Sequence, residues 1–250
     1  MEIVIIGSGN VATHLIKAFQ ENNINIKQLY GRNSSDLEHL SKTFSIPYST
    51  TTLEKADLYL ISVSDRAVED VSKLITYSDC LVAHTSGSLP VDILQGDYRK
   101  ASFYPLQTFS KTKDLDYKKI PFFIETEERR DEIYLLELAK KISENVMIST
   151  FEKRKYIHLT AVFSCNFVNH LFTRAKEISD KQEIPFEYFL PLIDETVEKI
   201  HSVNPKEAQT GPAVRNDVRI LELHENLIDD EEHLKIYQTL NNSIKKMYNL

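Results

Sequence analysis

The chain has 250 residues, 42% of them hydrophobic and 27% charged, and a formal net charge of -7. These values are typical of a globular protein, and the acidic balance argues against a nucleic-acid or acidic-membrane binder, because either needs a basic surface. No apolar run approaches the roughly 20 residues of a membrane span. A glycine-rich turn begins at Gly7, too early for a signal peptide. Cys80 and Cys165 form no CxxC pair, so we expect a reduced, cytoplasmic protein without a metal site.

The first 150 residues predict alternating strands and helices. The run Ile3 to Ile6 is apolar and β-branched, which suits a strand buried on both faces of a parallel sheet. Ser34 or Ser35 is a possible N-cap, and so is Asp65. Further strands are predicted at 24–30, 56–65, 79–87, 100–109, 120–127 and near 147, and helices at 11–20, 34–44 and 128–143. This alternation predicts an α/β domain over residues 1–150 with a doubly wound, mainly parallel sheet.

The pattern changes near Thr150. Few strand-like runs follow, and prolines fall at helix boundaries, where they are tolerated. Helices are predicted at 153–181, 185–202, 213–225 and 230–248. We therefore expect a second, all-helical domain over residues 151–250.

The turn after the first strand has the pattern Gly-x-Gly-x-x-Ala. The first glycine permits a tight turn, the second lets a pyrophosphate approach the backbone, and the small third residue allows close packing of helix on strand. The helix that follows offers free N–H groups to phosphates. The sequence thus predicts a dinucleotide site built from Gly7, Ser8, Gly9, Asn10, Val11 and Ala12. A turn that binds nothing, or an S-adenosylmethionine site, is the alternative.

The end of the second strand indicates which dinucleotide binds. NAD sites usually place an acidic residue there, but this chain has Arg32, Asn33 and Ser34, with no acid before Asp36. Arg32 can pair with a 2′-phosphate, and the other two can donate hydrogen bonds to it. The sequence therefore favours NADP over NAD, unless Arg32 is an ordinary exposed residue.

Several segments resemble one family. "AHTSGSLP", "YPLQTF", "HLTAVFSCNFVNHLF" and "QTGPAVRND" are similar to bacterial oxidoreductases that join a Rossmann domain to a DUF2520 domain. These proteins are described as NADP- or F420-dependent and are related to β-hydroxyacid dehydrogenases and pyrroline-carboxylate reductases. The resemblance covers nearly the whole chain and implies an NADP-dependent oxidoreductase, with ketopantoate-type reduction as one candidate reaction.

Polar residues end two of the predicted parallel strands, where ligands bind in such sheets. Val63 and Ser64 follow one strand and are expected to border the cofactor. His84 and Ser86 follow the next. Ser86 can bond a substrate oxygen, and His84 is a candidate acid because its ordinary pKa is near 6.5. Alternatively, His84 ends a buried strand and only bonds the backbone.

The predicted long helix carries His158, Val162, Asn166, Asn169 and Thr173 along one face, at spacings of three or four. The helix is apolar almost all round, which predicts that it is buried. Buried amides need partners. Asn166 is therefore a candidate substrate contact, or else it bonds a neighbouring helix.

The segment Thr210 to Asp217 joins a turn to a predicted helix. Arg215 could clamp a carboxylate with two hydrogen bonds, oriented by Asp217, which implies an anionic substrate. Alternatively, Arg215 and Asp217 form an ion pair between helices.

Related hydroxyacid dehydrogenases carry a lysine four residues before the asparagine of the long helix. Here Val162 stands four residues before Asn166, so a proton would come from His84, His158, His170, a serine or water. We predict an NADP-dependent reductase of a small carbonyl or imine, such as a 2-oxo acid, a ketopantoate-like acid or a cyclic imine, bound in a cleft between the domains. The helical domain is expected to form a homodimer. The alternative is a non-catalytic NADP-binding sensor.

Overall fold

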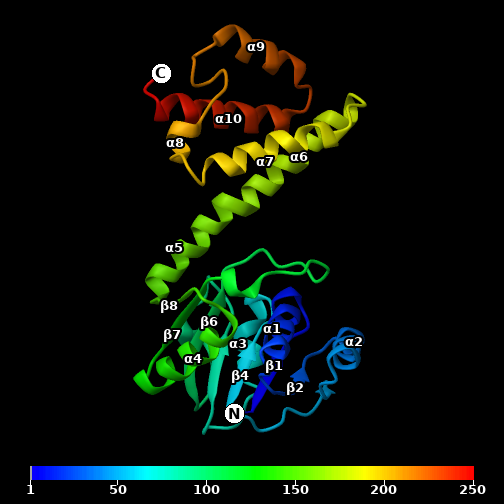
Figure 1. Ribbon diagram of the computed structural model, residues 1–250, viewed down its shortest axis with the longest axis vertical. Coiled ribbons are helices and arrows are strands. Elements are labelled where there is room, and N and C mark those ends of the chain that lie inside the picture. The colour runs from blue at the N-terminus through cyan, green and yellow to red at the C-terminus, as the bar shows by residue number, and fades with distance from the viewer. Residues whose placement is uncertain (1) are drawn as a thin grey trace. The chain divides into compact units, whose positions relative to one another are not determined.

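The computed structural model describes residues 2–250, in which eight strands form one sheet (Figure 1). The strand order is β3-β2-β1-β4-β5-β6-β7-β8. Neighbouring strands are parallel except β6 and β7. The strands are β1 (Ile3–Ile6), β2 (Ile26–Tyr30), β3 (Tyr48–Ser49), β4 (Leu58–Ile61), β5 (Leu81–His84), β6 (Arg99–Pro105), β7 (Phe122–Thr126) and β8 (Val146–Ile148). The predicted α/β fold with a mainly parallel sheet is confirmed.

The sheet is covered on both faces. All four residues of β1 are buried, and they alternate between two apolar clusters: Ile3 and Ile5 join one cluster, Val4 and Ile6 the other. A strand that packs on both sides needs a continuous apolar run, which explains the unbroken β-branched sequence. The helices between the strands are α1 (Asn10–Glu21), α2 (Ser34–Phe44), α3 (Asp65–Ser72) and α4 (Arg129–Ile142).

Two helix starts differ from the prediction by one residue. Asn33, not Ser34 or Ser35, is the N-cap of α2, and its side chain accepts a hydrogen bond from the Asp36 N–H at 3.2 Å. Ser64, not Asp65, is the N-cap of α3. The predicted turns are therefore correct, and only the choice among neighbouring polar residues was wrong.

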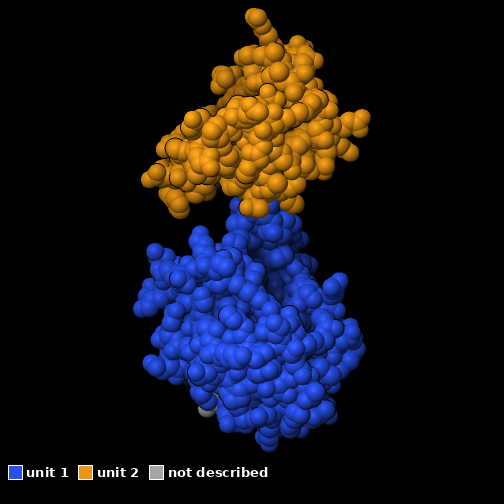
Figure 2. Space-filling model, turned by 90° about the vertical axis from the view of Figure 1, so that its right-hand side faces the viewer, with its two compact units in different colours: residues 1–166 blue, residues 167–250 orange. Residues whose placement is uncertain are grey.

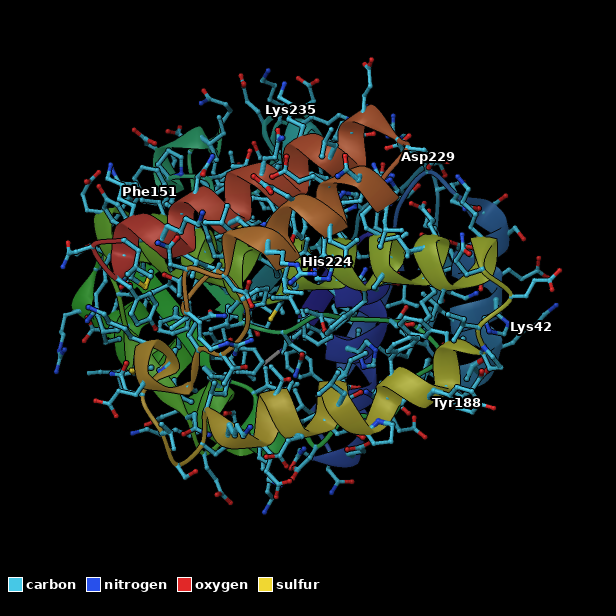
Figure 3. All side chains as sticks on the ribbon, turned by 90° about the horizontal axis from the view of Figure 1, so that it is seen from above. Lys42, Phe151, Tyr188, His224, Asp229 and Lys235 are labelled. Atoms are coloured by element: carbon cyan, nitrogen blue, oxygen red, sulfur yellow. The ribbon has the colours of Figure 1, made fainter. Side chains whose placement is uncertain are left out.

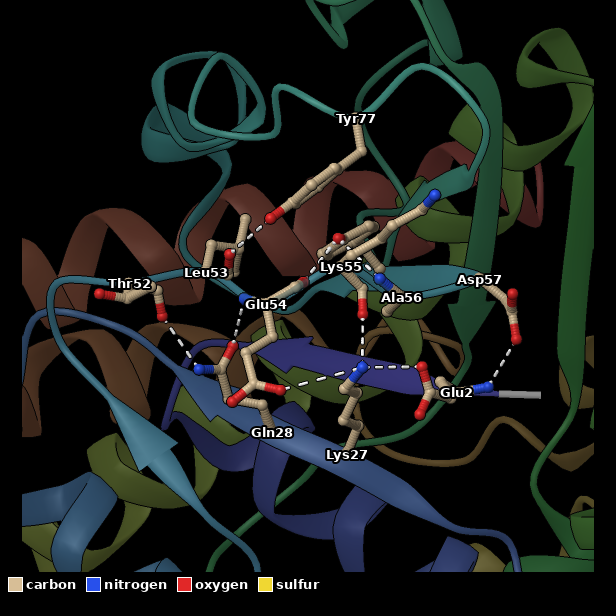
Figure 4. Close-up of polar contacts among 11 residues, drawn as sticks. Glu2, Lys27, Gln28, Thr52, Leu53, Glu54, Lys55, Ala56, Asp57 and Tyr77 are labelled. Carbon is tan, nitrogen blue, oxygen red and sulfur yellow. Dashed lines mark hydrogen bonds and ion pairs between the residues drawn. The ribbon is translucent and has the colours of Figure 1, made fainter.

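The amino end of the sheet is tied together by charged and polar contacts (Figure 4). Lys27 Nζ on β2 donates to Glu2 Oε2 at 2.7 Å and to the Lys55 carbonyl at 2.8 Å. Gln28 donates to the Thr52 carbonyl at 2.9 Å. These bonds fix the loop before β4. They lie at the amino ends of the strands, whereas ligands in such sheets bind at the carboxyl ends.

Two compact units make up the chain, residues 1–166 and residues 167–250, coloured separately in Figure 2. The first unit extends past the change to helical sequence near residue 150, because it includes α5 (Phe151–Ala161) and the turn at residues 162–166. The remaining helices are α6 (Phe167–Lys181), α7 (Leu190–Lys199), α8 (Pro205–Ala208), α9 (Val218–Leu227) and α10 (Glu231–Met247).

The second unit is built from helices alone within the described residues. Its helices α9 and α10 are joined through His224, whose Nδ1 lies 3.0 Å from the Tyr237 hydroxyl (Figure 3). Lys181 of α6 forms an ion pair with Asp229 in the turn between α9 and α10. The all-helical character predicted for the C-terminal region is thus present.

The long helix differs from its prediction in two respects. It is interrupted by a π-helical turn at residues 162–166 between α5 and α6. It is also exposed, with Phe163 64% and Phe167 49% accessible. The prediction of a buried helix was therefore wrong for the single chain, in which these apolar side chains are largely accessible.

Candidate cofactor and active site

A groove of about 280 Å³ lies at the carboxyl ends of β1 and β4. The turn after β1 forms one side and the turn after β4 the other. Its lining is Gly7, Ser8, Gly9, Asn10, Val11, Ser62, Val63 and Ser64. The structure thus brings together seven of the predicted cofactor contacts, while Ala12 is buried beneath them and packs in the core.

The two glycines of the turn meet different needs. Gly7 has a φ of 124°, and a Cβ added there would lie 2.3 Å from the Ser62 carbonyl oxygen, so only glycine fits. Gly9 has no atom within 4 Å of an added Cβ. It faces the open groove, which is the property a closely approaching pyrophosphate requires.

The start of α1 is free to bind an anion. Gly9 is its N-cap, no side chain caps it, and its first turn carries no acidic residue. Asn10 donates to the Phe109 carbonyl at 2.8 Å, which secures the turn. The uncapped N–H groups and the helix dipole favour a phosphate at the groove. The residues present therefore fit a dinucleotide.

A cationic side chain, not an acidic one, follows β2 and is exposed to solvent. Arg32, Asn33 and Ser34 are exposed there. The nearest acid, Asp36, is paired with Lys111 at 2.9 Å. Asn33 uses its side-chain oxygen to cap α2, which leaves its amide NH2 as the donor it can offer.

His84 is enclosed at the end of β5. Its ring is 0% exposed, and Nδ1 accepts a hydrogen bond from the Ser86 N–H at 3.2 Å. Burial, aided by the charge of Arg154 and partly opposed by the Pro90 carbonyl, lowers the pKa of His84 to about 3. A neutral, enclosed ring is a poor proton donor, so the structure favours the alternative of a buried residue bonded to the backbone.

Ser86 lies in the turn after His84 and is nearly buried. Its side-chain oxygen accepts a hydrogen bond from the Ser88 N–H at 3.0 Å and shapes the turn. The hydroxyl proton remains available to a ligand. Contact between Ser86 and a substrate stays a prediction.

A second pair of polar residues lies against this turn. The Tyr104 hydroxyl of β6 is 3.1 Å from His158 Nδ1 of α5. A Cβ added to Gly87 would lie 2.7 Å from Tyr104 Cζ and 2.9 Å from His158 Nδ1. His158 was among the candidate proton donors predicted from the sequence. Tyr104 was not among the candidate site residues, although the segment "YPLQTF" contains it.

The two predicted substrate contacts of the helical region are exposed. Asn166 ends the π-helical turn, so it is not the buried amide that was expected. Arg215 is also exposed. Asp217 caps α9 by accepting from the Ile220 N–H at 3.3 Å, and no ion pair between Arg215 and Asp217 is present. Asp217 thus caps a helix in this structure, and an orienting role toward Arg215 stays a prediction.

Two family models match the chain, and the boundary between them differs from the boundary between the compact units. Residues 2–94 match the family model "NADP oxidoreductase coenzyme F420-dependent", and residues 120–244 match a domain of unknown function, DUF2520. A Bacteroides fragilis protein described as an NADP oxidoreductase is 38% identical, with 98% of each chain covered and a TM-score of 0.93. The chain belongs to the family of NADP oxidoreductases that carry a DUF2520 domain. No curated protein matches it.

More distant structures share the fold. A Thermotoga maritima protein is 20% identical over 99% of this chain and 98% of its own, with a TM-score of 0.74. A 1-pyrroline-5-carboxylate reductase of Streptococcus pyogenes is 14% identical over 98% of both chains, with a TM-score of 0.63. The predictions of family, of oxidoreductase activity and of NADP as the cofactor class are confirmed.

Among residues 2–250, no helix has the length and apolar character needed to cross a bilayer.

Proposed function

We propose that this oxidoreductase uses NADPH to reduce a small carbonyl or imine compound, such as a 2-oxo acid, a ketopantoate-like acid or a cyclic imine. The observation that carries the proposal is the groove at the uncapped start of α1, which is open above Gly9 and bordered by Val63 and Ser64. NADPH supplies a hydride when bound. The chain holds the dinucleotide and orders the substrate beside it.

Different residues around the groove would bind different parts of the dinucleotide. The N–H groups of residues 8–11 would bind the pyrophosphate, and Arg32, with Asn33 and Ser34, would bind the 2′-phosphate. Arg32 supports this assignment because it is exposed next to the start of α2, where the helix dipole also favours an anion.

The substrate is proposed to be anionic, with Arg215 and Asn166 among its contacts. Their exposure leaves the guanidinium and the amide available to a ligand. A carboxylate suits Arg215 because the planar guanidinium can donate two parallel hydrogen bonds.

A homodimer in the cytoplasm is the proposed form of the protein. Support comes from the apolar side chains that the helices leave exposed, including Leu159 at 48%, Leu192 at 64% and Leu227 at 72%. A dimer interface would remove apolar side chains of this kind from water.

The test measures NADPH binding and NADPH oxidation separately. Calorimetric titration should show tight NADPH binding, weakened at least tenfold, about 1.4 kcal/mol, in Gly9→Val, because the added side chain occupies the phosphate's place. Since an added Cβ meets no protein atom within 4 Å, the fold should remain intact. Unchanged affinity would contradict the proposed cofactor site.

Oxidation of NADPH is then followed with a panel of 2-oxo acids and cyclic imines. Turnover with one panel member supports the reductase. Tight binding without turnover across the panel would instead indicate the non-catalytic sensor.

A further inference from the structure

Tyr104 and His158 form a polar pair that the proposed function has not yet used. They come from β6 and α5, with the hydroxyl 3.1 Å from Nδ1 and the ring centroids 6.1 Å apart in an edge-to-face arrangement. Gly87 packs against both, and no side chain fits at that position without moving them. Three separate segments therefore hold the pair in place.

The pair is continuous with the groove through the turn after β5. Thr85 Oγ1 donates to the Ile61 carbonyl at 3.3 Å and lies 3.5 Å from Ser62 Oγ, which lines the groove. Gly87, two residues after Thr85, contacts His158. This edge of the sheet is where the reactive end of a dinucleotide lies in doubly wound folds.

The two partners differ in what they can do. Tyr104 is 8% exposed, and burial raises the pKa of its hydroxyl to about 12, so the hydroxyl stays protonated near neutral pH. His158 is half-exposed, and its Nε2 makes no hydrogen bond within residues 2–250. Nε2 is therefore able to meet a ligand, while Nδ1 is held.

The charged groups around the pair are few. Arg154 on α5 and Asp65 on α3 act on the Tyr104 hydroxyl with opposite signs. His84 on β5 is neutral at physiological pH. His158 is thus the group of this cluster that contacts the Tyr104 hydroxyl and is also partly exposed.

We propose that His158 donates the proton in the reduction and that Tyr104 positions its ring; this rests on the proposed function. The Tyr104 oxygen accepts a hydrogen bond from Nδ1–H of the imidazolium, which aims Nε2–H at the substrate. The hydride pair forms the new C–H bond. The π pair of the carbonyl or imine moves to its oxygen or nitrogen, which takes the Nε2 proton. Neutral imidazole remains and is reprotonated by water.

The test compares His158→Gln and Tyr104→Phe with His201→Gln, an exposed histidine outside the pair, as the control. In His158→Gln we expect kcat to fall by about 10²–10⁴-fold, the usual contribution of general acid catalysis. Wild-type activity should fall as the pH rises, because the donor must be protonated, and this limb of the pH profile should be absent in the variant. The NADPH Kd should stay within about threefold.

A second measurement does not depend on turnover. Proton NMR of the imidazole follows the titration of His158 in wild type and in Tyr104→Phe. We expect Tyr104→Phe to shift this titration and to lower kcat by about tenfold while leaving the Kd for NADPH unchanged.

The outcomes separate the two proposals. If His158→Gln keeps wild-type kcat and the same pH limb, His158 is not the donor. If the titration of His158 is the same in Tyr104→Phe, the hydroxyl does not position the ring. If the wild type binds NADPH but oxidises it with no compound of the panel, the proposed function fails, and the proton donation falls with it.

Discussion

The imidazole of His84 shows how burial sets the charge of a single residue. It is enclosed at the end of β5, with Nδ1 bonded to the Ser86 N–H and the charge of Arg154 nearby. Protonation would place a second cation in an enclosed region close to the charge of Arg154. The ring therefore stays neutral, and its role is to fix the turn that carries Ser86 and Gly87.

This burial has a consequence for stability against pH. The pKa of His84 is about 3 in the folded protein, against an ordinary value near 6.5, so below pH 6.5 the unfolded chain binds the extra proton. Stability should fall as the pH drops from 6.5 toward 3, by about 2 kcal/mol between pH 7 and pH 5.

Urea unfolding at the two pH values checks this prediction. His84→Gln should lose less stability than wild type over the same interval, because its side chain does not titrate. His201→Gln, which changes an exposed histidine, should behave like wild type. Equal losses of stability in wild type and His84→Gln would show that protonation of His84 does not destabilise the folded protein.

A second prediction at the scale of residues concerns Arg32, which is proposed to set the choice between NADPH and NADH. Arg32→Asp removes the partner of the 2′-phosphate and supplies an acceptor for a ribose hydroxyl. A hydrogen bond to a charged group contributes roughly 1.5–3 kcal/mol, so the preference for NADPH over NADH should shift by about that much toward NADH.

The measurement is the ratio of the two dissociation constants. Lys113→Asp, an exposed charge reversal in the loop before β7, is the control and should leave the ratio unchanged. If the wild type already prefers NADH, or if both variants move the ratio equally, Arg32 does not contact the phosphate.

At the scale of elements, a buried ion pair joins α5 to the sheet. Arg154 is 0% exposed, pairs with Glu125 of β7 and donates to the Leu89 carbonyl. Glu125 also accepts a hydrogen bond from the Phe151 N–H at 2.9 Å, at the first residue of α5. The helix that carries His158 is thereby fixed at its start.

Removing one partner should cost more than removing both charges. Arg154→Met leaves the Glu125 carboxylate unpaired and should destabilise the protein by about 3 kcal/mol. Glu125→Gln in the same chain keeps the hydrogen bond to Phe151 and removes that charge, so the double variant should recover at least about 1 kcal/mol. Urea unfolding of the two single variants and the double variant measures this, and purely additive losses would contradict a coupled pair.

The elements also show what sequence can predict. The β1 strand and the α1 turn followed from the sequence because an apolar β-branched run and two glycines are local signals. The exposure of α5 and α6 did not follow, because an apolar pattern predicts burial and carries no information on which surface would cover the helix. The π-helical turn at residues 162–166 has no distinct sequence signal that we recognised.

At the scale of the whole molecule, the groove was predictable and the Tyr104–His158 pair was not. The groove residues lie in two short turns whose positions follow from strand order. The pair joins residues 54 apart in the chain, and its contact depends on where α5 packs against β6. Only tertiary structure selects Tyr104 from the twelve tyrosines of the sequence.

The exposed apolar side chains of the helices lead to the last prediction, which concerns assembly. Leu159 lies on α5 and is 48% exposed, and Leu74, just after α3, is 50% exposed. If the helices form the interface of a homodimer, Leu159→Glu places a charge in that interface, and burying an unpaired charge is costly. Wild type and Leu74→Glu should sediment as dimers, whereas Leu159→Glu should shift toward monomers at the same concentration.

The melting temperature of wild type should also rise with protein concentration, because association stabilises the folded state by mass action. A wild type that sediments as a monomer at all concentrations, or a Leu159→Glu variant that remains fully dimeric, would place the covering surface elsewhere.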